Sequence, residues 1–213
     1  AIEADKDMVH ILRSEGQTHL GLYVVEEDAA RLDLRALCNH HGIETPPIVA
    51  GNLPYAITGA IMRWACDNAT QLKRCVFMVQ KEVGERLGAS PSNSDYGALT
   101  VFVQNHFEAR VVQRIGRGAF FPQPKVDSVV IELLPRSVPI APETKAFQAT
   151  VRAAFDARRK TLRKALSQHL LTIDQTDAAL EVASIDGQRR GETLSVKEFA
   201  VLAHAVAEQS RLG

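Results

Sequence analysis

The four residues Asn52-Leu53-Pro54-Tyr55 follow a short apolar run and a glycine, so they are expected to end a strand. In an open α/β sheet, ligands collect at the carboxyl ends of the strands. The Asn52 side chain offers a carbonyl acceptor, and Pro54 lacks an N–H donor, so this corner favours hydrogen-bond acceptance. Tyr55 offers a flat face for a base. The set suits a planar ring with an exocyclic amine, although the string alone is more often a proline turn with a half-buried tyrosine.

Two acidic residues also follow expected strands. Glu3 comes after the first strand and Asp28 after the next. A carboxylate at such a position typically holds the ribose hydroxyls of a nucleotide, and an acid after the following strand can accept from an adenine amine. Acidic residues are also common in solvated loops. Without other motifs, a solvated loop is the favoured interpretation of these two residues.

A loop rich in glycine and proline presents two aromatic residues, Phe120 and Phe121. One of them is placed to stack on the second face of a base already held by Tyr55. Enzymes that modify a base reach it by flipping it into such a sandwich. Taken alone, the loop is also consistent with an aromatic side chain that plugs a hairpin against the core.

The segment Phe147–Leu170 has the apolar spacing of one helix, and its other face is basic. Arg158 falls within the apolar arc, where an ion-paired, partly buried arginine is expected. The remaining cations suit a phosphate backbone, or form an ordinary solvated face. These cations are Arg152, Arg159, Lys160, Arg163 and Lys164.

The order of the expected elements indicates an α/β fold with a helical appendage. Short strands, including a buried one over Leu20–Val25, alternate with helices up to residue 107, which predicts a parallel sheet covered on both faces. Ala109–Val112 and Val126–Leu134 read as an antiparallel pair at the sheet edge. Pro135–Pro142 is a linker, and only helices follow. The predicted domains are therefore residues 1–135 and 143–213.

Composition restricts the class of protein. The chain has 213 residues, 46% hydrophobic and 23% charged, which excludes a disordered chain and a disulfide scaffold. No window approaches the ~18 consecutive apolar residues of a membrane span. Three widely spaced cysteines predict reduced thiols in a cytoplasmic protein, and their spacing predicts no metal site. The net charge is zero, but residues 136–213 carry 12 basic and 9 acidic side chains, which leaves room for a local basic surface.

Four strings occur in an order and spacing typical of one family: GNLPY at 51–55, FMVQKEV at 77–83, AFFPQPKVDS at 119–128 and AFDARRKTLRKAL at 154–166. Together they resemble the bacterial small-subunit (16S) ribosomal RNA adenine dimethyltransferases of the KsgA/RsmA family, over essentially the whole chain. The Erm enzymes, which methylate 23S rRNA, share the Asn-Leu-Pro-Tyr type of corner. The KVDS and RRKTLRKAL runs make the chain more similar to KsgA.

The resemblance implies a Rossmann-like methyltransferase domain and a small all-helical C-terminal domain that binds RNA. It also implies S-adenosylmethionine as methyl donor, no metal, and a monomer acting on the immature 30S subunit. The acceptors are two adjacent adenosines in the 3′-terminal hairpin of 16S rRNA, each methylated twice on its exocyclic amine. The implied catalytic residues are Asn52, Leu53, Pro54, Tyr55 and Phe120, with a backbone carbonyl beside Pro54 as second acceptor. The implied cofactor residues are Glu3, Asp28, Ala29 and Asn52, and the implied RNA-binding residues are Lys125, Arg152, Arg159, Lys160, Arg163 and Lys164.

The family's first strand and glycine-rich cofactor loop belong before Glu3 and are not among these 213 residues. We therefore expect a gap between the strands that end at Glu3 and Asn52, with unpaired central edges and an uncovered apolar face. This leaves a second class open, a non-catalytic RNA-binding factor of ribosome assembly. An Erm-like 23S rRNA methyltransferase differs only in substrate. A DNA adenine methyltransferase is disfavoured by Leu53 and by the basic C-terminal segment.

Overall fold

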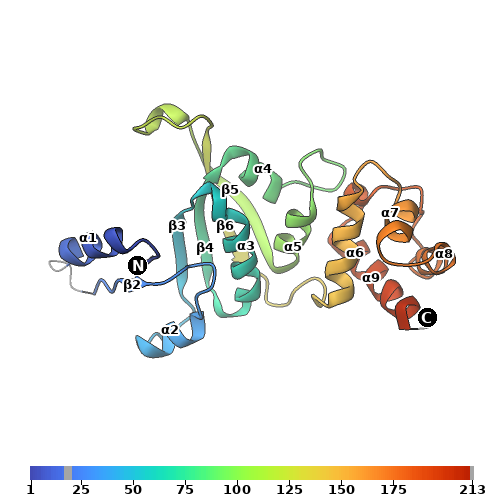
Figure 1. Cartoon of the computed structure of the whole chain (residues 1–213), viewed down its shortest axis with the longest axis horizontal. Coiled ribbons are helices and arrows are strands. Elements are labelled where there is room, and N and C mark those ends of the chain that lie inside the picture. The colour runs from blue at the N-terminus through green and yellow to red at the C-terminus, as the bar shows by residue number, and fades with distance from the viewer. Residues whose placement is uncertain (17–20, 212–213) are drawn as a thin grey trace.

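The computed structural model describes residues 1–16 and 21–211, and its strands form two separate sheets. Strands β1 (Ile2–Glu3) and β2 (Val25–Glu26) form a small parallel sheet. The main sheet has the order β3-β4-β6-β5, in which β3 and β4 are parallel and β6 is antiparallel to both its neighbours. Its strands are β3 (Ile48–Asn52), β4 (Arg74–Gln80), β5 (Phe107–Ile115) and β6 (Ser128–Pro135). The main sheet lies at the centre of the molecule, between the small sheet and the C-terminal helices (Figure 1).

The expected gap in the sheet is confirmed. Strands β1 and β3 belong to different sheets, so each keeps an edge that no described strand pairs. Side-chain contacts, and no backbone hydrogen bonds between the described strands, join the small sheet to the main sheet. The Trp64 indole donates to the Leu32 carbonyl at 2.8 Å, and Leu32 and Leu34 are buried against the main core.

Most helices begin at a residue whose side chain accepts a hydrogen bond from the first turn. Asp33 accepts from the N–H of Ala36, and Ser195 and Glu198 form a capping box at the start of the last helix. The helices are α1 (Lys6–Gly16), α2 (Leu34–His40), α3 (Thr58–Asp67), α4 (Lys81–Leu87), α5 (Ala98–His106), α6 (Lys145–Asp156), α7 (Leu162–His169), α8 (Ile173–Val182) and α9 (Val196–Arg211).

The prediction that helices cover both faces of the sheet is wrong for the described part of the chain. Helices α3, α4 and α5 pack against one face, where side chains of β4 and β6 such as Phe77 and Ile131 are almost fully buried. On the other face, β3 exposes Ile48 (56% exposed), Ala50 and Asn52. Helix α1 contacts β1 and β2, so it leaves this face of the main sheet uncovered.

Two predicted elements differ from the structure. The buried strand predicted over 20–25 is reduced to Val25–Glu26, since its partner β1 has only two residues; Tyr23 is exposed, and residue 20 lies outside the described residues. The single helix predicted over 147–170 is broken into α6 and α7. Thr161 caps α7, and the N–H groups of Leu162 and Arg163 donate to carbonyls of residues 189 and 187. That distant loop replaces the bonds that a continuous helix would make.

The C-terminal helices enclose a second hydrophobic core. It is centred on Phe147, Leu166 and Phe199, and it also takes in Tyr96 and Val101, which precede the predicted linker. Arg158 forms the predicted ion pair, here with Glu192 at 2.8 Å, and also donates to the carbonyls of residues 94 and 96. The division at 135–143 stays a prediction, because loop 89–96 and α5 contribute to the helical side.

A polar junction ties the linker to the main sheet domain. The Glu143 carboxylate accepts from His106 Nε2 at 2.6 Å, from the Arg63 guanidinium and from Gln148 Nε2 at 2.9 Å, and its side chain is only 9% exposed. Burial opposes ionisation, but the hydrogen bonds from His106 and Arg63 outweigh it and lower the pKa of Glu143 to about 2. Beside it, Asn105 exchanges two hydrogen bonds with the Ala141 backbone.

The Glu143 junction generates a stability prediction. We expect Glu143→Gln to lower the free energy of unfolding by about 1–3 kcal/mol at neutral pH, because it weakens charge-assisted hydrogen bonds in a nearly buried site. The folded pKa lies below the unfolded value of ~4.3, so this contribution is complete above that value and is lost as pH falls towards 2. Urea unfolding of both proteins between pH 7 and 3 measures it. A wild-type advantage that stays constant over this range would contradict the assignment.

Helix α4 generates a second prediction, because Gly84 lies directly on β6. A Cβ at Gly84 would lie 2.2 Å from Val129 Cγ2 and 3.1 Å from Ile131 Cγ2. We expect Gly84→Ala to destabilise the protein by about 1–3 kcal/mol through overpacking. The matched control is Gly59→Ala in α3, where a Cβ meets nothing within 4 Å and alanine favours the helix by up to about 1 kcal/mol. Thermal unfolding of both variants should therefore shift in opposite directions.

Candidate functional site

The corner after β3 is a rigid turn that leaves two side chains exposed. The N–H of Leu53 donates to the Met78 carbonyl at 3.0 Å, which continues the pairing with β4 by one residue and buries the Leu53 side chain. Tyr55 starts a 3-10 helix (Tyr55–Ile57) and is 48% exposed. Asn52, the last residue of β3, is also exposed. The backbone therefore fixes both side chains at the carboxyl end of the strand.

The hydrogen bonds of this turn distinguish the two carbonyls that flank the proline ring. The Pro54 carbonyl accepts from the N–H of Ile57 and from Thr58 Oγ1, both at 3.1 Å. These two donors use both of its lone pairs. Leu53 is therefore the better candidate for the backbone acceptor that the sequence analysis placed beside Pro54. Thr58 is the first residue of α3, and its hydroxyl links the start of that helix to this turn.

All five residues predicted to be catalytic line one cavity of about 350 Å³. Its size lies within the range of small-molecule sites. Asn52, Leu53, Pro54 and Tyr55 form one side, and Phe120 comes from the loop between β5 and β6. Phe121, the alternative to Phe120 in the aromatic loop, also lines the cavity. No sequence motif assigns a role to the other lining residues; the pairing of Asn52 with Met78 in the sheet is the signal that identifies one of them. These residues are Met78, Pro122, Pro124 and Ser128.

The loop that carries Phe120 is held by Asp127. The Asp127 carboxylate accepts from the N–H of Arg117 at 3.0 Å, and its backbone carbonyl accepts from the N–H of Lys81 at 2.9 Å. The first bond closes the loop across its base, and the second attaches it to the start of α4. Because β6 pairs with β4, this anchored loop lies at the same end of the sheet as the Asn52 corner.

Of the predicted cofactor residues, Glu3 ends β1, Asp28 and Ala29 lie just after β2, and Asn52 ends β3 of the main sheet. The Glu3 carboxylate accepts from the N–H of Asp5 at 2.9 Å, and the Asp28 carboxylate accepts from the N–H of Ala30 at 2.9 Å. Asp28 also lies 3.6 Å from the exposed Arg31 guanidinium, and Ala29 packs against the main core. Glu3, Asp28 and Ala29 do not line the cavity around Asn52. Their role in cofactor binding stays a prediction.

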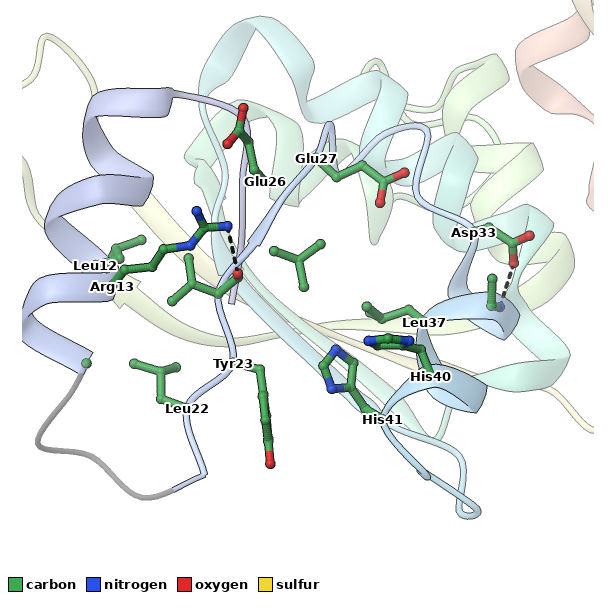
Figure 2. Close-up of a pocket in the computed structure, with 14 residues that line it drawn as sticks. Leu12, Arg13, Leu22, Tyr23, Glu26, Glu27, Asp33, Leu37, His40 and His41 are labelled. Carbon is green, nitrogen blue, oxygen red and sulfur yellow. Dashed lines mark hydrogen bonds between the residues drawn. The ribbon is translucent and has the colours of Figure 1, made fainter.

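A larger cavity, of about 820 Å³, lies between α1, residues 22–27 and α2 (Figure 2). Tyr23 stacks on His41 with ring centroids 4.8 Å apart, and His40 meets His41 edge to face at the same distance. Its lining includes Glu26 and Glu27 but neither Glu3 nor Asp28. None of the residues predicted to be catalytic or to bind the cofactor lines this cavity.

The predicted RNA-binding cations do not share one helix, so the single stripe expected on a helix over 147–170 is wrong. Arg152 lies on α6, Arg163 and Lys164 lie on α7, and Arg159 and Lys160 lie in the turn between these helices. All are exposed. Arg163 forms a two-point ion pair with Asp177, at 2.5 and 2.7 Å, and is less available to a phosphate than the others. Lys125 lies apart from them, in the loop beside Phe120.

The thiols in the main core do not suit nucleophilic chemistry. Cys66 and Cys75 are buried, and burial raises the pKa of each to about 12. Within residues 1–16 and 21–211, no three His, Cys, Asp or Glu side chains are grouped to hold a metal ion. The same residues contain no helix long and apolar enough to cross a bilayer.

The fold defines the class as a Rossmann-like methyltransferase. Two solved structures share it: a dimethyladenosine transferase from Plasmodium falciparum (TM-score 0.78, 22% identity, 98% of this chain and 82% of that one) and the 23S rRNA methyltransferase ErmE (TM-score 0.64, 24% identity, 97% and 80%). The ribosomal RNA adenine dimethylase model matches residues 1–208. A ribosomal RNA small subunit methyltransferase A from Clostridium acetobutylicum is 38% identical over 208 residues, covering 97% of this chain and 74% of the relative. The chain belongs to the ribosomal RNA adenine dimethylase family, whose members are S-adenosylmethionine-dependent enzymes.

Proposed function

We propose that this chain dimethylates the exocyclic amines of two adjacent adenosines in the 3′-terminal hairpin of 16S rRNA. The observation that carries the proposal is the single cavity lined by Asn52, Leu53, Pro54, Tyr55 and Phe120. Two acceptors and two aromatic rings around one opening match an adenine that has left its stack. The family membership and the small-subunit relative support the choice of substrate.

The acceptors act on the amine of the target base. Asn52 Oδ1 and the Leu53 carbonyl each accept one amine hydrogen, which directs the nitrogen lone pair out of the ring plane. Tyr55 and Phe120 hold the two faces of the ring. As the nitrogen forms its bond to the methyl carbon, it becomes positive, and these fixed acceptors stabilise that charge. Catalysis by this chain is then mostly a matter of positioning.

When bound, S-adenosylmethionine would supply the methyl group: the N–C bond forms as the S–C bond breaks, the neutral thioether leaves, and the methylated nitrogen then loses a proton to water. Glu3 and Asp28 offer carboxylates at the ends of β1 and β2, where they suit ribose hydroxyls and an adenine amine respectively. Ala29 and Asn52 would complete the adenosine side of that site. The chemistry of these side chains fits the adenosine part of the donor.

The substrate is proposed to be the immature 30S particle, bound by a monomer in the cytoplasm. The exposed cations of α6, α7 and their connecting turn are proposed to contact the phosphate backbone, together with Lys125. The exposed cations would also serve one second candidate, an RNA-binding assembly factor that does not use the methyl donor. Binding of S-adenosylmethionine discriminates the two.

The proposal predicts that Asn52→Ala lowers methyl transfer by about 100-fold or more, because one of the two charge-stabilising acceptors is lost. RNA affinity should change less than about threefold, since Asn52 contacts only the target base. Transfer of a radiolabelled methyl group to purified 30S particles measures the first quantity, and filter binding measures the second. Circular dichroism confirms the fold of the variant.

The controls separate the alternatives. Methylation of 23S rRNA or duplex DNA in preference to 30S particles would contradict 16S rRNA as the substrate. Calorimetric titration of S-adenosylmethionine into the folded wild-type chain should show binding. RNA binding without donor binding would support the assembly factor instead. Equal loss of methyl transfer and RNA binding in Asn52→Ala would mean that the side chain is structural.

The RNA surface gives a further prediction. We expect the double variant Arg159→Glu/Lys160→Glu to bind RNA more weakly and to reduce the slope of log affinity against log salt by about 1–2. Both side chains are exposed in the turn between α6 and α7. Lys197→Glu, an exposed cation at the start of α9, is the matched control and should leave the slope unchanged. An unchanged slope in the double variant would place the phosphate contacts elsewhere.

A further inference from the structure

Phe121 is the most exposed large apolar side chain among the described residues, at 101% of its reference area. It lies in the β5–β6 loop, which projects beyond the end of the main sheet (Figure 1). Leaving a phenylalanine fully in water forgoes the stabilisation that burial of its side chain would give. At the mouth of a cavity, such a ring is available to be covered when a partner binds.

The loop holds this ring outward. A short 3-10 helix covers 117–119, the N–H of Ala119 donates to the Gly116 carbonyl at 3.0 Å, and Asp127 closes the base of the loop. The Phe120 side chain is half-buried in the cavity wall, whereas the Phe121 side chain is fully exposed at the rim of the same cavity.

The surroundings of Phe121 specify the chemistry of the partner. Tyr55, on the opposite side of the same cavity, is half-exposed. Arg117 and Lys125, in the same loop, are exposed cations; the hollow that they line also contains acidic residues, namely Glu82, Glu85, Asp95 and Asp127. A flat apolar surface with two cations in its own loop fits an unpaired nucleobase, whose ring stacks on the aromatic face while a phosphate meets the loop cations.

We propose that Phe121 is a wedge that stacks on the nucleobase next to the target adenosine and fills the space that the adenosine leaves in the stack. Inserted apolar side chains separate base steps in this way in other nucleic-acid complexes. The inference rests on the proposed function, because it takes the cavity beside Phe121 as the site of the flipped adenine. Phe121 is a positioning residue, and Phe120 faces the base that reacts.

The test uses an RNA hairpin with two adjacent adenosines in its loop, the first replaced by fluorescent 2-aminopurine, in the absence of methyl donor. We expect Phe121→Ala to bind roughly 5- to 100-fold more weakly and to give a smaller fluorescence rise. Phe121→Trp should stay within about twofold of wild type, because a larger ring still stacks. The matched control is Val126→Ala, another exposed apolar residue of the loop, which should bind as wild type does.

Salt dependence separates a wedge from a disturbed loop. Loss of an uncharged side chain weakens binding by the same factor at all salt concentrations. The slope of log affinity against log salt should therefore be the same in Phe121→Ala as in wild type. A reduced slope would mean that Arg117 and Lys125 have moved, and would overturn the proposal, as would wild-type affinity and fluorescence in Phe121→Ala. If Phe121→Ala weakens RNA binding but the wild-type chain transfers no methyl group, the proposed function is contradicted and the role of Phe121 in RNA binding is not. Absence of RNA binding by wild type would overturn both.

Discussion

The insertion of β6 between β4 and β5 determines where every part of the candidate site lies. Its antiparallel register pairs Ser128 with Gln80, so the loop that precedes β6 arrives where β3 ends. A shift of one residue would turn Val129 and Ile131 out of the core and carry the loop with them. Gly84 reinforces this register, because only a residue without a side chain lets α4 lie so close to β6.

Ion pairs support this register on the side of the sheet that the apolar core does not cover. On the open face of the sheet, Glu132 of β6 is buried and accepts from Arg74 at 2.8 Å and from Arg110 at 2.5 Å, which joins three adjacent strands. At the end of the sheet away from Asn52, Glu143 joins the linker to α3 and α5. The main sheet thus has one side packed by helices and another that carries the Glu132 ion pairs beside exposed apolar residues such as Ile48.

The sequence predicted the features that depend on local strings. The Asn52 corner, the aromatic loop and the antiparallel pair follow from residues close together in the chain, and the structure places the first two at one cavity. The gap beside Glu3 follows instead from the family resemblance. The break between α6 and α7 was missed because its cause is a loop more than twenty residues away. The choice of Leu53 over Pro54 as acceptor, and the outward direction of Phe121, depend on hydrogen bonds and exposure that no pattern of residue types encodes.

The open edge of β3 determines how another extended segment could pair with this sheet. An unpaired strand edge with exposed apolar side chains, here Ile48 and Ala50, is a template onto which another extended chain can add. Natural sheets protect such edges with prolines or charges, and β3 has Pro46 and Pro47 before it but no charged residue within it. A strand that pairs along this edge would therefore fix the backbone leading to Asn52 on both of its sides.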